Sequence, residues 1–566
     1  MFWFSPVHQI SDSDFSLLLS QSLIEHGTFK LDRYFPDPPA PIAHPDYVEI
    51  VKYQLELVNG HTYYFFPPGT SVLSAPFVAL LKPFGIQPRN NSGTYGEMTI
   101  QTSLAALLMA FLAFVFFITA RLITLDRIWS TVIAMGGVLG SQVWSTASRG
   151  LWSHTWELLL IGLVVFLIVE AEETRTQPRS VLLATLLAWA YFVRPTAGIV
   201  IAVVTILLML YYRRSLVSYL LTLSMWFVGF VLYSQYNFGK PLPSYYAASR
   251  LDFRVFGDAL AGNLISPSRG LLIYSPWILF TAYLLIRYGR NLNNQRLLWL
   301  SLAVLLGQLA VVSAFPFWWG GVSYGPRLTT DLVPWLVLLN IIGVRAMLKS
   351  RGQQTSSQFA FKAELVAGAL LLVFSIGVHA GGAISDSTVR WNDYPKDDVG
   401  MRAKIWDWHQ AQFLAGLVPP MHPREYPRID GEMIDLGASA ADRFLWLGWG
   451  RPENHFRWTD GNESFIVFGD ERADRTLVID CAPFIVPGRV DSQTVQIELN
   501  GQALQTVTLD KQEYQRLVLR LPAAAMKPQN ILVLRLPYAT SPASLRLSID
   551  QRRLGLAVRS IEFQKG

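Results

Sequence analysis

A succession of long apolar runs between Thr99 and Gly382 constrains the fold of this chain more than any other feature. A helix needs about 20 apolar residues to cross a bilayer, or somewhat fewer when it is packed among others. The chain has 16% charged residues, below the roughly 25% of soluble domains, which indicates a polytopic membrane protein. The sequence predicts about ten spans, at residues 100–121, 128–147, 152–170, 181–193, 196–212, 216–236, 271–287, 297–314, 329–348 and 362–382.

The short loops between these runs predict the orientation. If the spans alternate, most short-loop arginines and lysines fall at one end, which should be cytoplasmic because such loops are retained on that side. The residues concerned are Arg121, Arg127, Arg175, Arg179, Arg213, Arg214, Arg287, Arg290, Arg296, Arg345, Lys349, Arg351 and Lys362. The excess of arginine and lysine in these short loops explains the net charge of +6. The sequence contains no dense basic tract of the kind that would indicate a nucleic-acid partner.

Four regions follow from this pattern. Residues 1–98 form a non-cytoplasmic first loop with short helices, in which 32–53 read as loop and 71–84 as a re-entrant or interfacial helix. Residues 99–383 form the transmembrane domain, and 384–428 form a linker with one amphipathic helix. Period-two runs in 429–566 predict an antiparallel β-sandwich, with a hairpin at Asn500-Gly501. The fold class is therefore a polytopic α-helical membrane protein with a C-terminal all-β sandwich.

The single cysteine, Cys481, excludes an internal disulfide and a cysteine-based zinc site. Because a lone cysteine is most often a small buried apolar residue, we expect Cys481 to be buried in the β-sandwich and not to act as a nucleophile.

Two carboxylates, Asp12 and Asp14, stand ahead of a short helical pattern that begins near Phe15. A carboxylate beside a membrane is costly unless it has a partner or a chemical role. One interpretation is that Ser11, Asp12 or Ser13 caps the helix. The other is that one carboxylate is a general base that takes the proton of an acceptor hydroxyl. The two interpretations are compatible across the pair.

Cationic candidates lie on the same predicted face as Asp12. They are Arg149 and His154 in a tight turn, Arg194 between two spans, Arg269 at the end of a long loop, and Arg327 at the head of a later span. Such residues are often interfacial anchors whose charge reaches water. The alternative is that they bind a phosphate, because arginine offers a bidentate fork and histidine a tunable donor.

Aromatic residues near these positions predict a groove for an isoprenoid chain. Tyr63-Tyr64-Phe65-Phe66 precedes a Pro-Pro-Gly turn, and Trp318-Trp319 precedes Gly320-Gly321. A rigid turn explains the first motif equally well, and helix packing with an aromatic belt explains the tryptophans equally well. The predicted groove residues are Asp14, Tyr64, Trp152, Tyr245, Trp318 and Trp319.

The order of these motifs resembles the GT-C superfamily of polytopic glycosyltransferases that use polyprenyl-phosphate sugars. Bacterial relatives of protein O-mannosyltransferases and aminoarabinose transferases are the most similar group. The motifs that carry the resemblance are Ser11-Asp12-Ser13 before Leu23–Asp32, Pro67-Pro68-Gly69, Trp152-Ser153-His154, Arg194-Pro195, Ser266–Gly270, Trp318–Gly321, Gly325-Pro326-Arg327, Gly448–Glu453 and Arg457–Gly461.

The resemblance implies an inverting transfer on the non-cytoplasmic face of a bacterial inner membrane. Asp12, singled out over Asp14 by the downstream Leu31-Asp32, would be the base that activates a lipid-, glycan- or protein-linked acceptor. The lipid-phosphate leaving group would be stabilised by Arg149, His154, Arg194, Arg269 and Arg327, with Arg149 and Arg327 ranked first. A divalent metal is allowed by this chemistry but not required, and no metal ligands are predicted.

Two departures from the family qualify the resemblance. Phe65 and Phe66 stand where some relatives place a basic residue for the lipid phosphate. The family also has a transmembrane helix before the Asp loop, for which this chain has no room. Either the true start lies upstream of Met1, which we favour, or the loop is exported without such a helix.

Two other classes of function remain open at this point. A flippase for lipid-linked sugars would share the spans and the groove, but it should show inverted repeats, and none is visible in the sequence. A non-catalytic glycan-assembly protein would not need Asp12.

Overall fold

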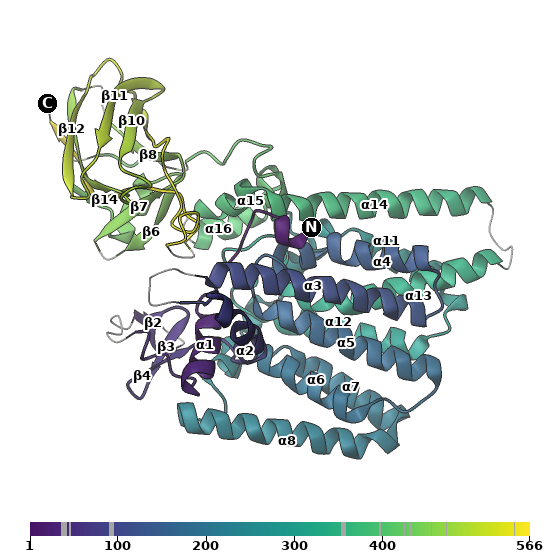
Figure 1. Cartoon of the computed structure of the whole chain (residues 1–566). Coiled ribbons are helices and arrows are strands. Elements are labelled where there is room, and N and C mark those ends of the chain that lie inside the picture. Colours follow the sequence, from purple (N-terminus) through teal and green to yellow (C-terminus); the bar gives the residue numbers. More distant parts are fainter. Residues whose placement is uncertain are drawn as a thin grey trace. The chain divides into compact units, whose positions relative to one another are not determined.

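The computed structural model describes residues 1–35, 42–44, 47–89, 96–352, 358–395, 398–423, 425–429, 433–453, 455–470, 473–547 and 550–565 (Figure 1). The chain divides into two compact units. The first contains Met1–Arg89, Gly96–Val389 and Ile405–Leu414, and the second contains Asn90–Tyr95, Arg390–Lys404 and Ala415–Gly566. We describe each unit by itself.

Helices dominate the first unit, and all ten predicted apolar runs fall on helical segments. Among the described residues, six helices are long and apolar enough to cross a membrane: 97–122, 153–174, 213–238, 295–313, 327–351 and 358–384. The helices in this region are α3 (Glu97–Leu122), α4 (Arg127–Leu139), α5 (Ser153–Thr174), α6 (Ser180–Val193), α7 (Ala197–Tyr211), α8 (Arg213–Phe238), α9 (Phe256–Ile265), α10 (Leu271–Tyr274), α11 (Trp277–Arg287), α12 (Gln295–Ser313), α13 (Val333–Gly352) and α14 (Gln358–Ile384).

Four of the predicted spans are shorter than a full crossing. They correspond to α4, α6, α7 and α11, which are 11 to 15 residues long. The predicted span 271–287 is interrupted between α10 and α11 by Ser275-Pro276, because proline cannot donate the next helical hydrogen bond. The predicted span 128–147 likewise divides into α4 and a π-helical turn, η3 (Val143–Ala147).

Within the bundle, α3 packs against α4 and α5, and α6 packs against α5 and α8. Two of the long helices bury little of their surface: only 22% of the apolar window of α8 and 11% of that of α14 is buried. Their large apolar side chains therefore lie on the outside of the bundle, where an ordinary soluble protein would place polar ones.

The first 89 residues form a small cap of α1 (Ser16–His26), a four-stranded antiparallel sheet and α2 (Gly69–Leu81). The strands, in sheet order, are β1 (Ile42–His44), β2 (Tyr47–Lys52), β3 (Leu55–Val58) and β4 (His61–Tyr64). The prediction that 32–53 is loop is therefore wrong for β1 and β2, since cross-strand pairing outweighs the prolines around them. Residues 36–41 and 45–46 lie outside the described residues.

The structure also corrects the predictions for Tyr63–Phe66 and for residues 71–84. The predicted turn at Tyr63–Phe66 is the end of strand β4 followed by a turn, because Tyr63 pairs with Glu56 and Tyr64 with Leu55. The helix predicted at 71–84 begins two residues earlier, as α2, and ends in a 3-10 turn at Lys82–Phe84.

The second unit contains two antiparallel sheets. One has the order β11-β10-β13-β8, and the other has the order β12-β9-β14-β7-β6, with β5 also paired to β14. Their strands are β5 (Met433–Asp435), β6 (Trp449–Glu453), β7 (Phe456–Asp460), β8 (Glu463–Gly469), β9 (Arg475–Pro483), β10 (Gln493–Leu499), β11 (Gln502–Leu509), β12 (Gln515–Leu521), β13 (Gln529–Arg535) and β14 (Leu554–Lys565).

Buried residues from both sheets form one hydrophobic cluster, in which Phe468 of β8 meets Phe563 of β14 with ring centroids 4.5 Å apart. The predicted hairpin at Asn500-Gly501 joins β10 to β11, and both residues have positive φ, as such a turn requires. Cys481 is buried in this cluster as expected, and burial raises the pKa of its thiol to about 12.

Residues 384–428 contain the short helices α15 (Asp386–Arg390) and α16 (Asp398–Ile405), together with 3-10 turns. This region is shared between the two units, since Ile405–Leu414 belongs to the first.

Candidate active site

Asp12 and Arg327 form an ion pair across 315 residues of sequence. Asp12 lies in the turn before α1, and Arg327 opens a 3-10 helix, η8 (Arg327–Leu332), that runs into α13. Arg327 Nη2 donates to Asp12 Oδ2, and the two side chains are 11% and 24% exposed. The pair thus joins two residues for which the sequence predicts different roles, Asp12 as the base and Arg327 as a phosphate-binding cation.

The guanidinium of Arg327 is held on two further sides. Its carbon lies 3.7 Å from the centroid of the Trp152 ring, and Nη1 donates to the carbonyl of Gly320 at 3.1 Å. Gly320 has φ of +75°, a conformation that favours glycine, and in this turn its carbonyl faces Arg327. Asp12 Oδ1 has no hydrogen bond among the described residues, which leaves one carboxylate oxygen for another partner.

The prediction that Ser11, Asp12 or Ser13 caps the first helix is wrong. The N-cap residue of α1 is Phe15, with φ of +67°, and no side chain of its own turn caps it. Instead Glu97, from the first turn of α3, accepts a hydrogen bond from Leu17 N at 3.3 Å. Because another helix supplies the acceptor, Asp12 is not needed as a cap.

Tyr64 fixes the backbone on the other side of Asp12. Its hydroxyl donates to the carbonyl of Asp12, and Gln54 Nε2 donates to the carbonyl of Ser11 at 3.0 Å. Burial and the nearby Asp12 charge raise the pKa of Tyr64, so its hydroxyl stays protonated and remains a donor. Asp14 lies in the same turn, where its backbone N–H donates to the carbonyl of Ser11.

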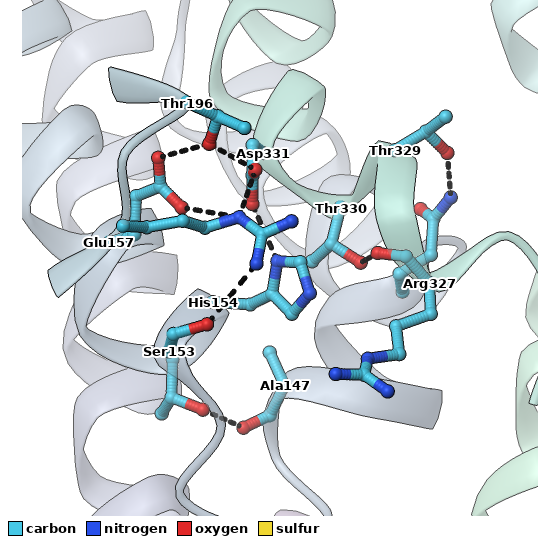
Figure 2. Close-up of polar contacts among 12 residues, drawn as sticks. Ala147, Ser153, His154, Glu157, Thr196, Arg327, Thr329, Thr330 and Asp331 are labelled. Carbon is cyan, nitrogen blue, oxygen red and sulfur yellow. Dashed lines mark hydrogen bonds and ion pairs between the residues drawn. The ribbon is translucent and has the colours of Figure 1, made fainter. Parts of the chain in front are cut away.

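A buried polar cluster surrounds Asp331, which lies on the same 3-10 helix as Arg327. The cluster consists of His154, Glu157, Arg194 and Asp331 (Figure 2). Asp331, on η8, accepts from His154 Nδ1 at 2.6 Å and from Arg194 Nε at 2.6 Å. Thr196 donates to Asp331 Oδ2 at 3.1 Å, and Glu157 Oε2 lies 3.3 Å from Arg194 Nε. Three side-chain hydrogen bonds thus converge on Asp331 of η8.

This polar cluster holds the element that carries Arg327. Asp331 follows Arg327 by four residues on η8, and Thr330 Oγ1 donates back to the carbonyl of Arg327. Arg194 and His154, predicted to meet a phosphate, are 7% and 0% exposed and are engaged by Asp331. Both side chains thus hold Asp331, four residues after Arg327, and their predicted contact with a phosphate stays a prediction.

Three members of the polar cluster have the residue types of a metal site. One ligand atom each from His154, Glu157 and Asp331 lies within 4.8 Å of the others. The guanidinium of Arg194, however, already lies against both carboxylates. Because that guanidinium supplies the positive charge that a metal ion would supply, these residues do not fit a metal while Arg194 stays in place.

Arg149 and Arg269, the other two predicted phosphate ligands, are buried and bound to backbone carbonyls. Arg149 donates to the carbonyls of Phe2, Ser5, Val7 and Trp144. Burial lowers its pKa to about 10, so it stays charged at neutral pH and anchors the N-terminal segment. Arg269 donates to the carbonyls of Trp319 and Ser268 and to the side chain of Gln412.

The predicted aromatic groove divides into two parts. Trp318 and Trp319 are at most 4% exposed, and the Trp318 ring packs so closely on Gly262 that a Cβ there would lie 2.2 Å from it. These two residues are packing residues. Tyr245 is instead half-buried and meets Phe65 and Phe66, each with ring centroids 5.5 Å away.

Arg250 is a cation that sequence reasoning passed over. Its guanidinium carbon lies 4.1 Å from the centroid of the Tyr245 ring, and Nη1 donates to the Tyr245 carbonyl.

Sequence reasoning also missed Glu97, Glu157 and Asp331, although a signal was present. Each is a carboxylate in or at the edge of a predicted span, and an ionisable residue in such a place usually has a partner or a role.

Comparisons with known proteins give no family for this chain. No protein-family model matches it, and no curated protein matches it. Among solved structures, one match is described as a novel family GH115 4-O-methyl-alpha-glucuronidase with specificity for decorated arabinogalactans. It has 11% sequence identity, covers 71% of this chain and 44% of that chain, and has a TM-score of 0.17, too low to carry an argument about fold or function.

Proposed function

We propose that the protein is an integral-membrane inverting glycosyltransferase of the GT-C type. It moves a sugar from a polyprenyl-phosphate donor to an acceptor on the non-cytoplasmic face of a bacterial inner membrane. The observation that carries the proposal is the ion pair of Asp12 and Arg327, which joins residues 315 positions apart in the first unit and leaves Asp12 Oδ1 without a hydrogen bond among the described residues.

Two further observations support a membrane enzyme. In the part of the chain that the structure describes, six helices are long and apolar enough to span a bilayer, and α8 and α14 present apolar faces outward, as helices in contact with lipid do. Two of the six helices, 153–174 and 327–351, carry His154 and Arg327 in their first turns, and these residues pair with Asp331 and Asp12. The motif order of the GT-C superfamily supplies the substrate class.

In the proposed reaction, Asp12 Oδ1 takes the proton of the acceptor hydroxyl. The acceptor oxygen attacks the anomeric carbon from the side opposite the lipid phosphate, the carbon–phosphate-oxygen bond breaks, and the configuration inverts. The electron pair of that bond leaves with the phosphate. General-base catalysis of this kind contributes about 10²–10⁴-fold to rate.

Arg327 fixes Asp12 Oδ2 in this scheme, so that Oδ1 is left to take the acceptor proton. Contact with the phosphate, which leaves on the opposite face of the sugar, would require Arg327 to turn away from Asp12. Of the five predicted phosphate ligands it is the most exposed, at 11% of its side chain, against 8% for Arg194. The half-buried face of Tyr245 and Phe66 supplies an apolar wall for an isoprenoid chain.

The test is reconstituted full-length protein with radiolabelled polyprenyl-phosphate sugars, comparing the wild type with Asp12→Asn. Asparagine keeps the shape but cannot take a proton, so transfer should fall by about 100-fold or more. Asp252→Asn is the matched control, since it removes a carboxylate that also pairs with an arginine, the exposed Arg254, and should leave transfer within about threefold of the wild type.

Transfer that survives Asp12→Asn would contradict the assignment of the base. Movement of the donor across vesicles without transfer would instead indicate a flippase for lipid-linked sugars.

A further inference from the structure

A second polar site lies far from Asp12, at the other end of α5. There the C-terminal turn of α5, α7, the start of α12 and Arg345 of α13 line a cavity of about 1370 Å³. Ser153 of α5 touches the polar cluster and Glu172 of α5 lines the cavity, so at 1.5 Å per residue the two sites are about 30 Å apart. The cavity is therefore separate from the proposed active site.

One end of the cavity is cationic and rich in hydrogen-bonding groups. Arg296 lies 3.6 Å from Glu172, and Arg345 lies 3.0 Å from Glu173. Arg175, exposed at the end of α5, adds a third guanidinium, so the lining carries three arginines against two glutamates. Arg296 is half exposed and its ion pair is long, which leaves guanidinium N–H groups for an anion.

The other end of the cavity is apolar, and its lining side chains are exposed on the outer surface of the helices. Its wall is formed by one face of α7 and one face of α12, and Ile206, Leu210 and Trp299 on it are 54%, 60% and 66% exposed. The two helices touch where a Cβ on Gly307 would lie 2.7 Å from Ile199, and they leave room between them at Leu210 and Trp299. The gap therefore widens from a tight contact toward the arginines.

We propose that this cavity binds one anionic phospholipid of the surrounding leaflet. Its phosphate would meet Arg296 and Arg175, and an acyl chain would lie along Leu210 and Trp299. A free polar metabolite does not need a wall of exposed isoleucine, leucine and tryptophan, whereas a lipid does. A zwitterionic headgroup does not balance the excess positive charge of the lining, whereas an anionic one does.

The proposal requires that the helices lie in a bilayer, but it does not require glycosyl transfer. The loop arginines place this cavity at the end predicted to be cytoplasmic, where anionic lipid attracts basic side chains.

The test is native mass spectrometry of the purified full-length protein in detergent. It is titrated separately with phosphatidylglycerol, with phosphatidylcholine of the same acyl chains, and with inorganic phosphate. We expect one phosphatidylglycerol to bind at least about tenfold more tightly than phosphatidylcholine, and inorganic phosphate to bind more weakly than either lipid.

Two variants test the two ends of the cavity. Arg296→Gln should weaken phosphatidylglycerol binding by about tenfold, because a charge-assisted hydrogen bond is lost. Ala303→Trp, at an exposed position of the apolar wall, should block the acyl chain and weaken binding by a similar factor without changing charge. Arg290→Gln is the matched control, since it removes an exposed arginine that does not line the cavity and should change binding less than twofold.

Equal binding of the two lipids, or equal weakening by Arg296→Gln and Arg290→Gln, would overturn the proposal. Inorganic phosphate binding as tightly as the lipid would show an anion site and no lipid site. Asp12→Asn should bind phosphatidylglycerol as the wild type does, so this result is separable from a failure of the proposed transferase activity.

Discussion

At the scale of single residues, the arginines of this protein divide by what surrounds them. Arg149 and Arg269 are buried and satisfied by backbone carbonyls, so they hold segments in place. Arg327 is instead bound to a carboxylate, an indole ring and one carbonyl beside the open side of Asp12. The sequence could present all of these arginines as candidates, but only the partners distinguish them.

Replacing Arg327 by lysine should therefore be costly. Lysine keeps the charge but loses the planar group that contacts Trp152, Gly320 and Asp12 at once. We expect kcat/KM for the lipid-linked donor to fall by about 100-fold in reconstituted protein. Arg254→Lys is the control, because Arg254 also pairs with an aspartate, Asp252, but is 91% exposed. Equal effects of the two substitutions would contradict the role of Arg327.

Glu56 on β3 provides a pH-dependent test of how the small N-terminal sheet region is packed. Burial raises its pKa to about 7, although Lys240 opposes the shift. A carboxyl with a raised folded pKa holds a proton that the unfolded chain releases, so its stabilisation is present below about pH 4.5 and is lost as pH rises through 7. The whole change is roughly 3 kcal/mol.

The measurement is the melting temperature of the wild type and of Glu56→Gln between pH 4.5 and 8. Glutamine imitates the protonated carboxyl at every pH, so the variant should become more stable than the wild type as pH rises. Two parallel melting curves across this range would show that Glu56 does not titrate in the folded protein.

At the scale of elements, η8 is the structure on which the site depends. It carries Arg327 at its start and Asp331 one turn later, and Asp331 is bound by residues from α5 and from the α6–α7 connection. Gln142, between α4 and η3, adds a contact to the carbonyl of Pro326. Three separate parts of the chain thus hold the helix that carries Arg327.

The two carboxylates of this polar cluster should differ sharply on substitution. Asp331→Asn leaves Arg194 and His154 without their shared buried partner and should lower the free energy of unfolding by about 3 kcal/mol or more. Glu157→Gln keeps the pair of Asp331 with Arg194 and should cost less than about 1 kcal/mol. Thermal unfolding in detergent measures both, and similar losses for the two variants would contradict this ranking.

At the scale of the whole molecule, the chain combines a helical unit with a β unit that has its own hydrophobic cluster. Within the helical unit, Arg175, Arg296 and Arg345 line one cavity, while Asp12 and Arg327 meet at the other end of α5. This grouping matches the alternation expected from the sequence. The side of the membrane on which each group lies stays a prediction.

That prediction can be measured with a membrane-impermeant maleimide on intact cells. In a Cys481→Ser background, Lys240→Cys should be labelled from outside, whereas Arg290→Cys should be labelled only after the cells are made permeable. Both positions are exposed, so access to the reagent decides the result. Labelling of Arg290→Cys in intact cells would reverse the proposed orientation.

The sequence by itself determined the apolar helical segments of the first unit and the β character of residues 429–566. Apolar runs and period-two alternation are local signals, because burying an apolar face requires that pattern whatever the partner is. The same signals placed the Asn500-Gly501 hairpin and presented Asp12 and Arg327 as candidates. They missed the whole first sheet, β1 to β4, where pairing between neighbouring strands outweighed the prolines and turn residues of the sequence.

Only the tertiary structure decided which candidates meet. A charge is stabilised by whatever lies within a few ångströms, and for Asp12 that partner is 315 residues away. The same holds for the cap of α1, which Glu97 supplies from α3, and for Asp331, whose partners come from α5 and from the α6–α7 connection. Packing between distant segments therefore decides the roles of the polar residues. The local pattern of apolar and polar residues predicts only the helices and strands that carry them.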